Sequence, residues 1–125
     1  TRFKDKNISI NVYNWGEYIS AGAEEGTLDV NAEFEKLTGI KVNYTTYESN
    51  EAMYAKLKSG SVAYDIIIPS DYMIHRMQRE DMLLEVDTSK ISNYDLVDKK
   101  YMGAYYDEES KFSVSVTKQC TAFAV

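Results

Sequence analysis

Hydrophobic and polar residues alternate in two short segments near the start of the chain. Ile8, Ile10 and Val12 are separated by polar residues and predict a strand over residues 8–13. The same alternation returns over residues 40–46 and predicts a second strand. The segment 64–68 differs, because it is continuously apolar after Asp65 and stops at Pro69. Such a run is typical of a strand covered on both faces.

Helical spacing follows each predicted strand. Val30, Phe34 and Leu37 recur at helical intervals between Asp29, a candidate N-cap, and Gly39, where a helix would end. A second helix is predicted after Ser49 or Asn50, with Met53 and Leu57 on its apolar side, and a third with Met73, Ile74 and Met77. We expect Asp71 to cap this third helix rather than to contact a ligand.

Strands that alternate with helices predict an α/β fold with an open, mainly parallel sheet and helices on both faces. Right-handed crossovers favour the strand order 2-1-3. Ligands of such sheets bind beyond the carboxyl ends of the strands, where the strand order reverses. The crevice between the first and third strands therefore selects two loops, residues 14–18 and 70–72.

The side chains of these two loops suit a cationic amine. Trp15 and Tyr72 offer aromatic faces for methylene groups and ammonium heads, and Glu17, Tyr18 and Ser70 offer oxygen acceptors for N–H donors. Each cation–π contact contributes about 0.5–2 kcal/mol. The pattern leaves one alternative open, in which Trp15 and Tyr18 simply cover the open end of the sheet.

Composition excludes several other classes. The chain has 125 residues, a size that fits one domain, and a net charge of −6 with no basic run, so we expect no nucleic-acid partner. One Cys and one His make a metal site improbable, and no Gly-rich phosphate loop or Gly-x-Ser-x-Gly elbow is present. We therefore expect no cofactor, no metal and no enzymatic activity. The sequence has no signal-peptide apolar region, and we expect a targeting segment to have been removed.

Three motifs together resemble the spermidine/putrescine substrate-binding proteins of bacterial ABC transporters. These are residues 13–18 (YNWGEY), 34–42 (FEKLTGIKV) and 64–72 (YDIIIPSDY), and the likeness runs from about residue 8 to residue 101. The first and third motifs are specific to that family, and the second is more widespread among solute-binding proteins.

The resemblance implies one lobe of a type II periplasmic-binding-protein fold, from a two-lobed receptor that closes around a polyamine and delivers it to an ABC transporter permease. Carried over by position, it implies ligand contacts at Trp15, Glu17, Tyr18, Ser70 and Tyr72. It also implies a location outside the cytoplasm, in the periplasm or lipid-anchored at the cell surface. Gly16 departs from the family, in which many relatives carry Thr or Ser.

The last residues also depart from the family pattern. We assign residues 1–111 to the first lobe and residues 112–125 to a tail that does not match. A first lobe without the second lobe of the receptor leaves a ligand half exposed, so we expect polyamine binding no tighter than about millimolar. We also expect self-association or a domain swap, because such a lobe exposes apolar surface or an open sheet edge.

Two other readings share this topology. One is a receptor lobe for a different small solute. The other is a flavodoxin-like enzyme or signalling domain, which would need clustered acidic residues or a hydroxyl-rich phosphate loop after the first strand. Trp15, Gly16 and Glu17 stand there instead.

Overall fold

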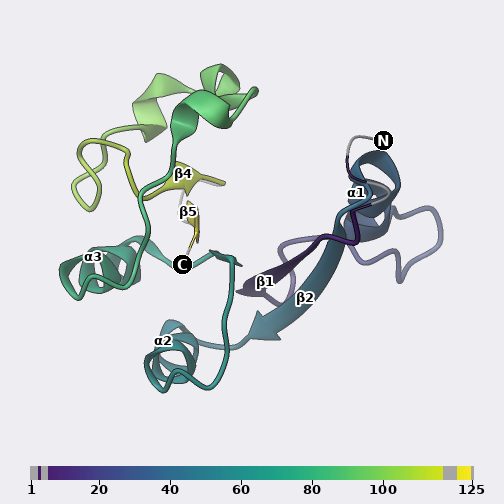
Figure 1. Ribbon diagram of the computed structural model, residues 1–125, viewed down its shortest axis with the longest axis horizontal. Helices are drawn as coiled ribbons and strands as arrows, with labels where there is room; N and C mark the ends of the chain where they lie inside the picture. The colour runs from purple at the N-terminus through teal and green to yellow at the C-terminus, as the bar shows by residue number, and fades with distance from the viewer. Residues whose placement is uncertain (1–2, 4–5, 117–120, 125) are drawn as a thin grey trace.

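A mixed sheet with the strand order β2-β1-β3-β5-β4 forms the centre of the molecule (Figure 1). The computed structural model describes residues 3, 6–116 and 121–124. Its strands are β1 (Ser9–Trp15), β2 (Lys41–Tyr47), β3 (Ile66–Ile67), β4 (Val114–Ser115) and β5 (Thr121–Ala124). β1 pairs in parallel with β2 on one side and with β3 on the other. The predicted α/β fold and its parallel 2-1-3 core are confirmed.

Three helices follow the three parallel strands, one after each. They are α1 (Val30–Thr38), α2 (Asn50–Lys58) and α3 (Asp71–Arg79). Three short 3-10 turns come next, η1 (Thr88–Lys90), η2 (Tyr94–Leu96) and η3 (Lys99–Tyr101). The chain then returns to the sheet, where β5 runs antiparallel to both β3 and β4. The described part of the 112–125 tail thus adds two strands to the same sheet.

Local capping explains where the first two helices begin and end. The Asp29 carboxylate accepts a hydrogen bond from the Ala32 amide at 2.9 Å, as expected of an N-cap. Gly39 ends α1 with a positive φ of 79°, a conformation that glycine adopts without steric cost. The hydroxyl of Ser49 caps α2 in the same way, through the Ala52 amide at 3.1 Å.

Two local predictions near the sheet edge are wrong. β1 does not stop at Tyr13 but continues to Trp15, because its pairing with β2 holds through the register partners Trp15 and Tyr47. The N-cap of α3 is Ser70, not Asp71, and the Ser70 side chain makes no capping hydrogen bond. Asp71 is the first residue of the helix, and its carboxylate accepts from the neighbouring Tyr72 amide at 2.7 Å.

The main core lies between the sheet and the pair α2 and α3. Met53 of α2 and Met73, Ile74 and Met77 of α3 are almost completely buried against Ile67 of β3. These are the apolar positions that the helical spacing selected. Closely packed side chains of this kind provide most of the hydrophobic stabilisation of a small domain.

α1 is different, because none of its residues is buried. Its apolar stripe, Val30, Phe34 and Leu37, is 43%, 38% and 74% exposed. In Figure 1, α1 lies at the end of the β1–β2 pair that is remote from α2 and α3. α1 thus contacts β2 but contributes no buried residue to the core.

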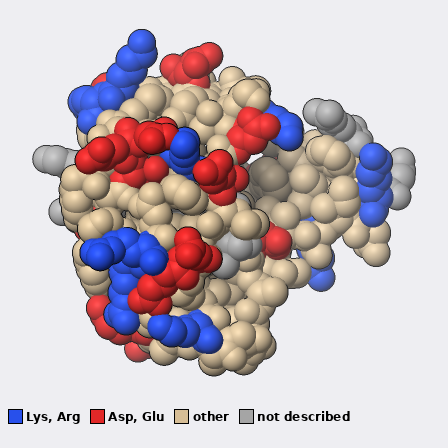
Figure 2. All heavy atoms as spheres, turned by 60° about the vertical axis from the view of Figure 1, so that its left-hand side comes forward, with Lys and Arg blue, Asp and Glu red and all other residues tan. Residues whose placement is uncertain are grey.

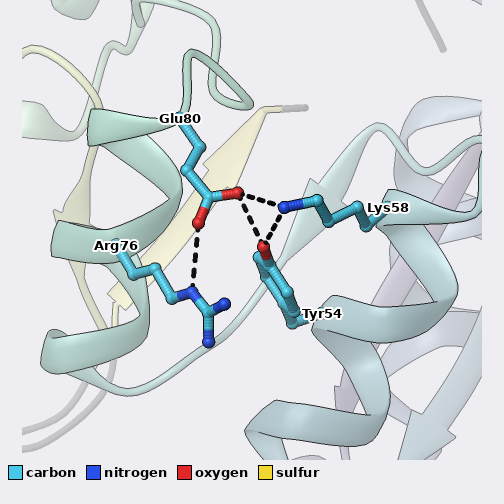
Figure 3. A network of polar contacts seen from close by, with 4 residues as sticks. All are labelled: Tyr54, Lys58, Arg76 and Glu80. Carbon is cyan, nitrogen blue, oxygen red and sulfur yellow. Dashed lines mark hydrogen bonds and ion pairs between the residues drawn. The ribbon is translucent and has the colours of Figure 1, made fainter.

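A polar network joins α2 to α3 (Figure 3). Glu80 accepts hydrogen bonds from the Tyr54 hydroxyl at 2.6 Å, from Lys58 at 2.8 Å and from Arg76 at 3.1 Å. The Arg76 guanidinium also lies 4.0 Å from the centre of the Tyr54 ring. Lys58, followed by Tyr54 and Arg76, lowers the pKa of Glu80 to about 2. On the face that carries α3, acidic and basic side chains are interspersed rather than gathered into a patch of one sign (Figure 2).

Candidate ligand-binding site

The carboxyl ends of the three parallel strands meet at one edge of the sheet. Trp15 ends β1 and is the register partner of Tyr47, which ends β2. Tyr13 pairs with Ile67 of β3, and the Ile68 amide donates to the Tyr13 carbonyl at 3.1 Å. Neighbouring strands of a sheet lie about 4.8 Å apart, so the segments that leave β1 and β3 start side by side.

A hollow of about 530 Å³ opens beside the end of β1. Three aromatic rings form one wall of this hollow. The centre of the Trp15 ring lies 4.7 Å from that of Tyr47 and 6.2 Å from that of Tyr18. Glu17 adds an exposed carboxylate to the same hollow. The lining residues are Trp15, Gly16, Glu17, Tyr18, Thr46, Tyr47 and Glu48. Rings and carboxylates around one opening are a combination that attracts organic cations.

Trp15 also packs against both apolar clusters of the sheet, so it does cover the sheet's open end. Among the described residues, its indole Nε1 is the one buried side-chain nitrogen or oxygen without a hydrogen-bond partner. A buried donor without an acceptor costs about 1–3 kcal/mol. The packing of the Trp15 ring therefore keeps its N–H group buried, although this N–H group makes no hydrogen bond there.

Ser70 and Tyr72 do not line this hollow. They form a second polar cluster with Asn50, whose amide donates to the Ser70 hydroxyl at 3.1 Å and to the Tyr72 hydroxyl at 2.9 Å. The Tyr72 hydroxyl in turn donates to the Glu51 carboxylate at 2.8 Å. This bond to Glu51 is the main reason why the pKa of Tyr72 is raised. Tyr72 as a whole residue is 49% exposed.

The last residue of β2 and the first residue of α2 connect the two groups of residues. Tyr47 packs against Trp15 with the two ring planes tilted by 52°, and its hydroxyl donates to the carbonyl of Ile68, two residues before Ser70. Asn50, three residues after Tyr47, contacts Ser70 and Tyr72. The sequence pattern predicts Ser49 or Asn50 only as a helix cap and gives no ligand-site role to this segment. Its position after a parallel strand nonetheless places it at the same edge of the sheet.

A second hollow, of about 460 Å³, lies on the other side of α3. It is lined by His75, Gln78, Arg79, Glu85, Tyr105, Tyr106, Asp107, Glu108, Glu109, Lys111 and Phe112. Both charge signs meet there, and Asp107 is engaged by the amides of Lys111 and Phe112 at 2.9 Å each. It lies away from the strand ends, where the topology of the sheet predicts the site.

Within residues 3, 6–116 and 121–124, no group of three or more His, Cys, Asp or Glu residues is arranged to hold a metal ion. No described helix has the length and apolar character needed to cross a membrane.

The chain belongs to the bacterial extracellular solute-binding proteins. The family's sequence model matches residues 8–116. The family consists of solute-binding proteins, not of enzymes.

Among the similar proteins is the spermidine/putrescine-binding periplasmic protein of Escherichia coli strain K12. It is 39% identical over 122 residues, which are 97% of this chain and 33% of the relative. Two solved structures are similar as well. The spermidine/putrescine ABC transporter substrate-binding protein PotD from Streptococcus pneumoniae has a TM-score of 0.77 and 40% identity, over 86% of this chain and 31% of that one. The TpPotD lipoprotein of Treponema pallidum has a TM-score of 0.73 and 31% identity, over 85% and 31%. The chain thus spans about a third of the length of these relatives.

Proposed function

We propose that this chain forms the first lobe of a receptor that binds polyamines of the spermidine and putrescine type for an ABC importer. The observation that carries the proposal is the hollow at the end of β1, where the rings of Trp15 and Tyr18 and the carboxylate of Glu17 surround one opening. Similarity to proteins named for spermidine and putrescine binding supports the same ligand class.

Each candidate residue has a role that fits an α,ω-diamine. Trp15 and Tyr72 pack on the methylene groups, where a flat ring covers apolar surface at a low cost in side-chain entropy. Glu17 and Tyr18, which line the hollow, accept N–H donors of one ammonium group, and Ser70, in the neighbouring cluster, accepts an N–H donor from another part of the same ligand. Gly16, which lines the same hollow, offers no hydroxyl group to the ligand.

The proposed partners are a small cationic amine and the permease of an ABC importer, and the proposed location is outside the cytoplasm. The names of the relatives, which include periplasmic proteins and a lipoprotein, support that location. A receptor lobe for another small solute is the alternative, because the fold alone does not select polyamines.

A titration followed by NMR tests the ligand class. Putrescine is added to ¹⁵N-labelled protein, and we expect the Trp15 indole and the amides of Glu17 and Tyr18 to shift in a saturable way. 1,4-Butanediol, which has the same chain length without the charges, should leave them unchanged at equal concentration. Glu17→Gln should weaken the response, whereas Glu25→Gln, in the exposed loop before α1, should not. Equal shifts with the diol, or none with putrescine and spermidine, would contradict the proposal.

We propose in addition that the isolated chain self-associates weakly through the apolar stripe of α1. Leu37 is 74% exposed and Leu28, just before the helix, is 59% exposed. Monomeric proteins rarely leave contiguous apolar patches larger than a few hundred Å² uncovered, and larger patches mark contact sites. A second copy can present the same stripe to that of the first copy across a two-fold axis.

A further inference from the structure

Asn50 is buried at the first residue of α2 and faces the loop that leaves β3. Asn50 is 5% exposed, and its side chain makes three hydrogen bonds to the residues that follow β3. The carbonyl oxygen accepts from the Ser70 amide at 3.1 Å. The two amide protons are donated to the hydroxyl groups of Ser70 and Tyr72, at 3.1 and 2.9 Å. Both donors and the carbonyl are thus directed at one short segment, twenty residues further along the chain.

The state of Ser70 shows that these bonds override a local preference. A serine at the N-cap of a helix normally accepts a hydrogen bond from an amide of the first turn. Ser70 is the N-cap of α3 but makes no such bond, and its hydroxyl accepts from Asn50 instead. A hydroxyl oxygen has two lone pairs, so one remains for a ligand N–H.

Tyr72 is fixed by the same cluster. Its hydroxyl accepts from Asn50 and donates to the Glu51 carboxylate at 2.8 Å. The hydroxyl end of the side chain is therefore tied to the start of α2, while almost half of the residue remains exposed. What Tyr72 can offer a ligand is mainly the face of its ring.

We propose that Asn50 is the positioning residue of the site, which holds Ser70 and Tyr72 in the conformation that receives the ligand. This inference rests on the proposed function. Asn50 does not contact the ligand itself, because it is buried and its donors and acceptor are already engaged. It acts through Ser70 and Tyr72, and the start of α3, which carries them, is ordered before the ligand arrives. A segment that is already ordered in the free protein loses no further conformational entropy when the ligand binds.

The test uses Asn50→Leu, which keeps the approximate shape of the side chain, adds no charge and removes the three bonds. Asn43→Leu is the matched control, since Asn43 is exposed and lies in the amino-terminal half of β2, away from the strand ends. Amide exchange and chemical shifts report on the loop. We expect the Ser70 amide to exchange at least about tenfold faster in Asn50→Leu, through lost protection of the local structure. The exchange rate of the Ser70 amide should not change in the control.

Binding of putrescine is measured on the same samples. We expect Asn50→Leu to weaken it at least about threefold. In double-mutant cycles, the losses from Asn50→Leu and Ser70→Ala should be non-additive, because the first acts through the second, whereas those from Asn50→Leu and Glu17→Gln should add. A residue that only stabilised the fold would give additive losses in both cycles. Additive losses with Ser70→Ala, or unchanged affinity, would overturn the inference.

These measurements distinguish failure of this inference from failure of the proposed function. If wild-type protein does not bind putrescine, the ligand class is wrong, and faster exchange of the Ser70 amide in Asn50→Leu then supports only the ordering of the loop. If Asn50→Leu does not fold, the wild-type protein still decides, because the side-chain NH₂ protons of Asn50 must be protected from exchange. Rapid exchange of both protons would overturn the inference.

Discussion

Trp15 combines two properties that separate binding from stability at the scale of a single residue. Its ring packs against Tyr47 and lines the strand-end hollow, while its buried Nε1 has no acceptor. In Trp15→Phe the unpaired donor disappears together with part of the ring. The gain of about 1–3 kcal/mol from the donor offsets the loss of packing. We therefore expect the free energy of unfolding in urea to change by less than about 1 kcal/mol.

Putrescine binding should respond differently to the same substitution. Tryptophan gives the strongest cation–π contact of the aromatic side chains, so we expect Trp15→Phe to weaken binding about two- to tenfold. Tyr101→Phe, a ring change on η3, serves as the control for both measurements. Unchanged affinity for putrescine, or a loss of unfolding free energy above about 3 kcal/mol, would contradict this reading of Trp15.

At the scale of elements, the network around Glu80 joins α2 to α3 and should make part of the stability depend on pH. The pKa of Glu80 is lowered from an ordinary value of 4.5 to about 2 in the folded protein, first of all by Lys58. A depressed folded pKa gives stability that is present above the unfolded value and is lost as the pH falls through the folded one. The contribution is therefore lost between about pH 4.5 and about pH 2.

Glu80→Gln removes this dependence. We expect the variant to be less stable than the wild type at pH 7 and the difference to shrink as the pH falls toward 2, in urea unfolding at a series of pH values. Because Glu80 is exposed, salt should reduce the difference. Glu109→Gln, which loses an exposed ion pair with Lys111, provides the comparison. A difference between wild type and Glu80→Gln that stays constant from pH 7 to pH 2 would contradict the assigned cause.

The elements also show what the sequence predicts and why the rest is missed. Caps such as Asp29, Ser49 and Gly39 were found because each depends on neighbours three or four residues away. The role of Asn50 was missed, because its partners Ser70 and Tyr72 become neighbours only when β2 and β3 share a sheet. The five proposed site residues were selected by topology and chemistry, yet periodicity gave no sign that they divide into two clusters joined by the loop after β2.

At the scale of the whole molecule, the chain spans about a third of its relatives' length, and the strand-end site is open. A ligand that lies on it keeps much of its surface in water, where ion pairs are screened and contribute about 0–1 kcal/mol each. We expect calorimetry to give a dissociation constant for spermidine no tighter than about millimolar. Micromolar binding by the monomer would contradict this expectation.

The stripe on α1 gives the second expectation at this scale. Val30, Phe34 and Leu37 are spaced as one helix face, and none is buried. One face of a helix of 9 residues on each copy is too small to bury the roughly 1,200–2,000 Å² of a stable interface, so association should be weak and depend on concentration. Light scattering after size exclusion should therefore show a mass that rises with protein concentration.

Leu37→Glu places a charge in that stripe and should keep the chain monomeric over the whole concentration range. Its matched control is Leu96→Glu in η2, which makes the same change at a residue that is 82% exposed. Both positions are largely exposed, so neither substitution should lower the unfolding free energy by more than about 0.5 kcal/mol. Should Leu37→Glu and Leu96→Glu reduce the mass equally, charge repulsion rather than the stripe governs association. A wild-type mass that stays monomeric at high concentration would contradict association through the α1 stripe.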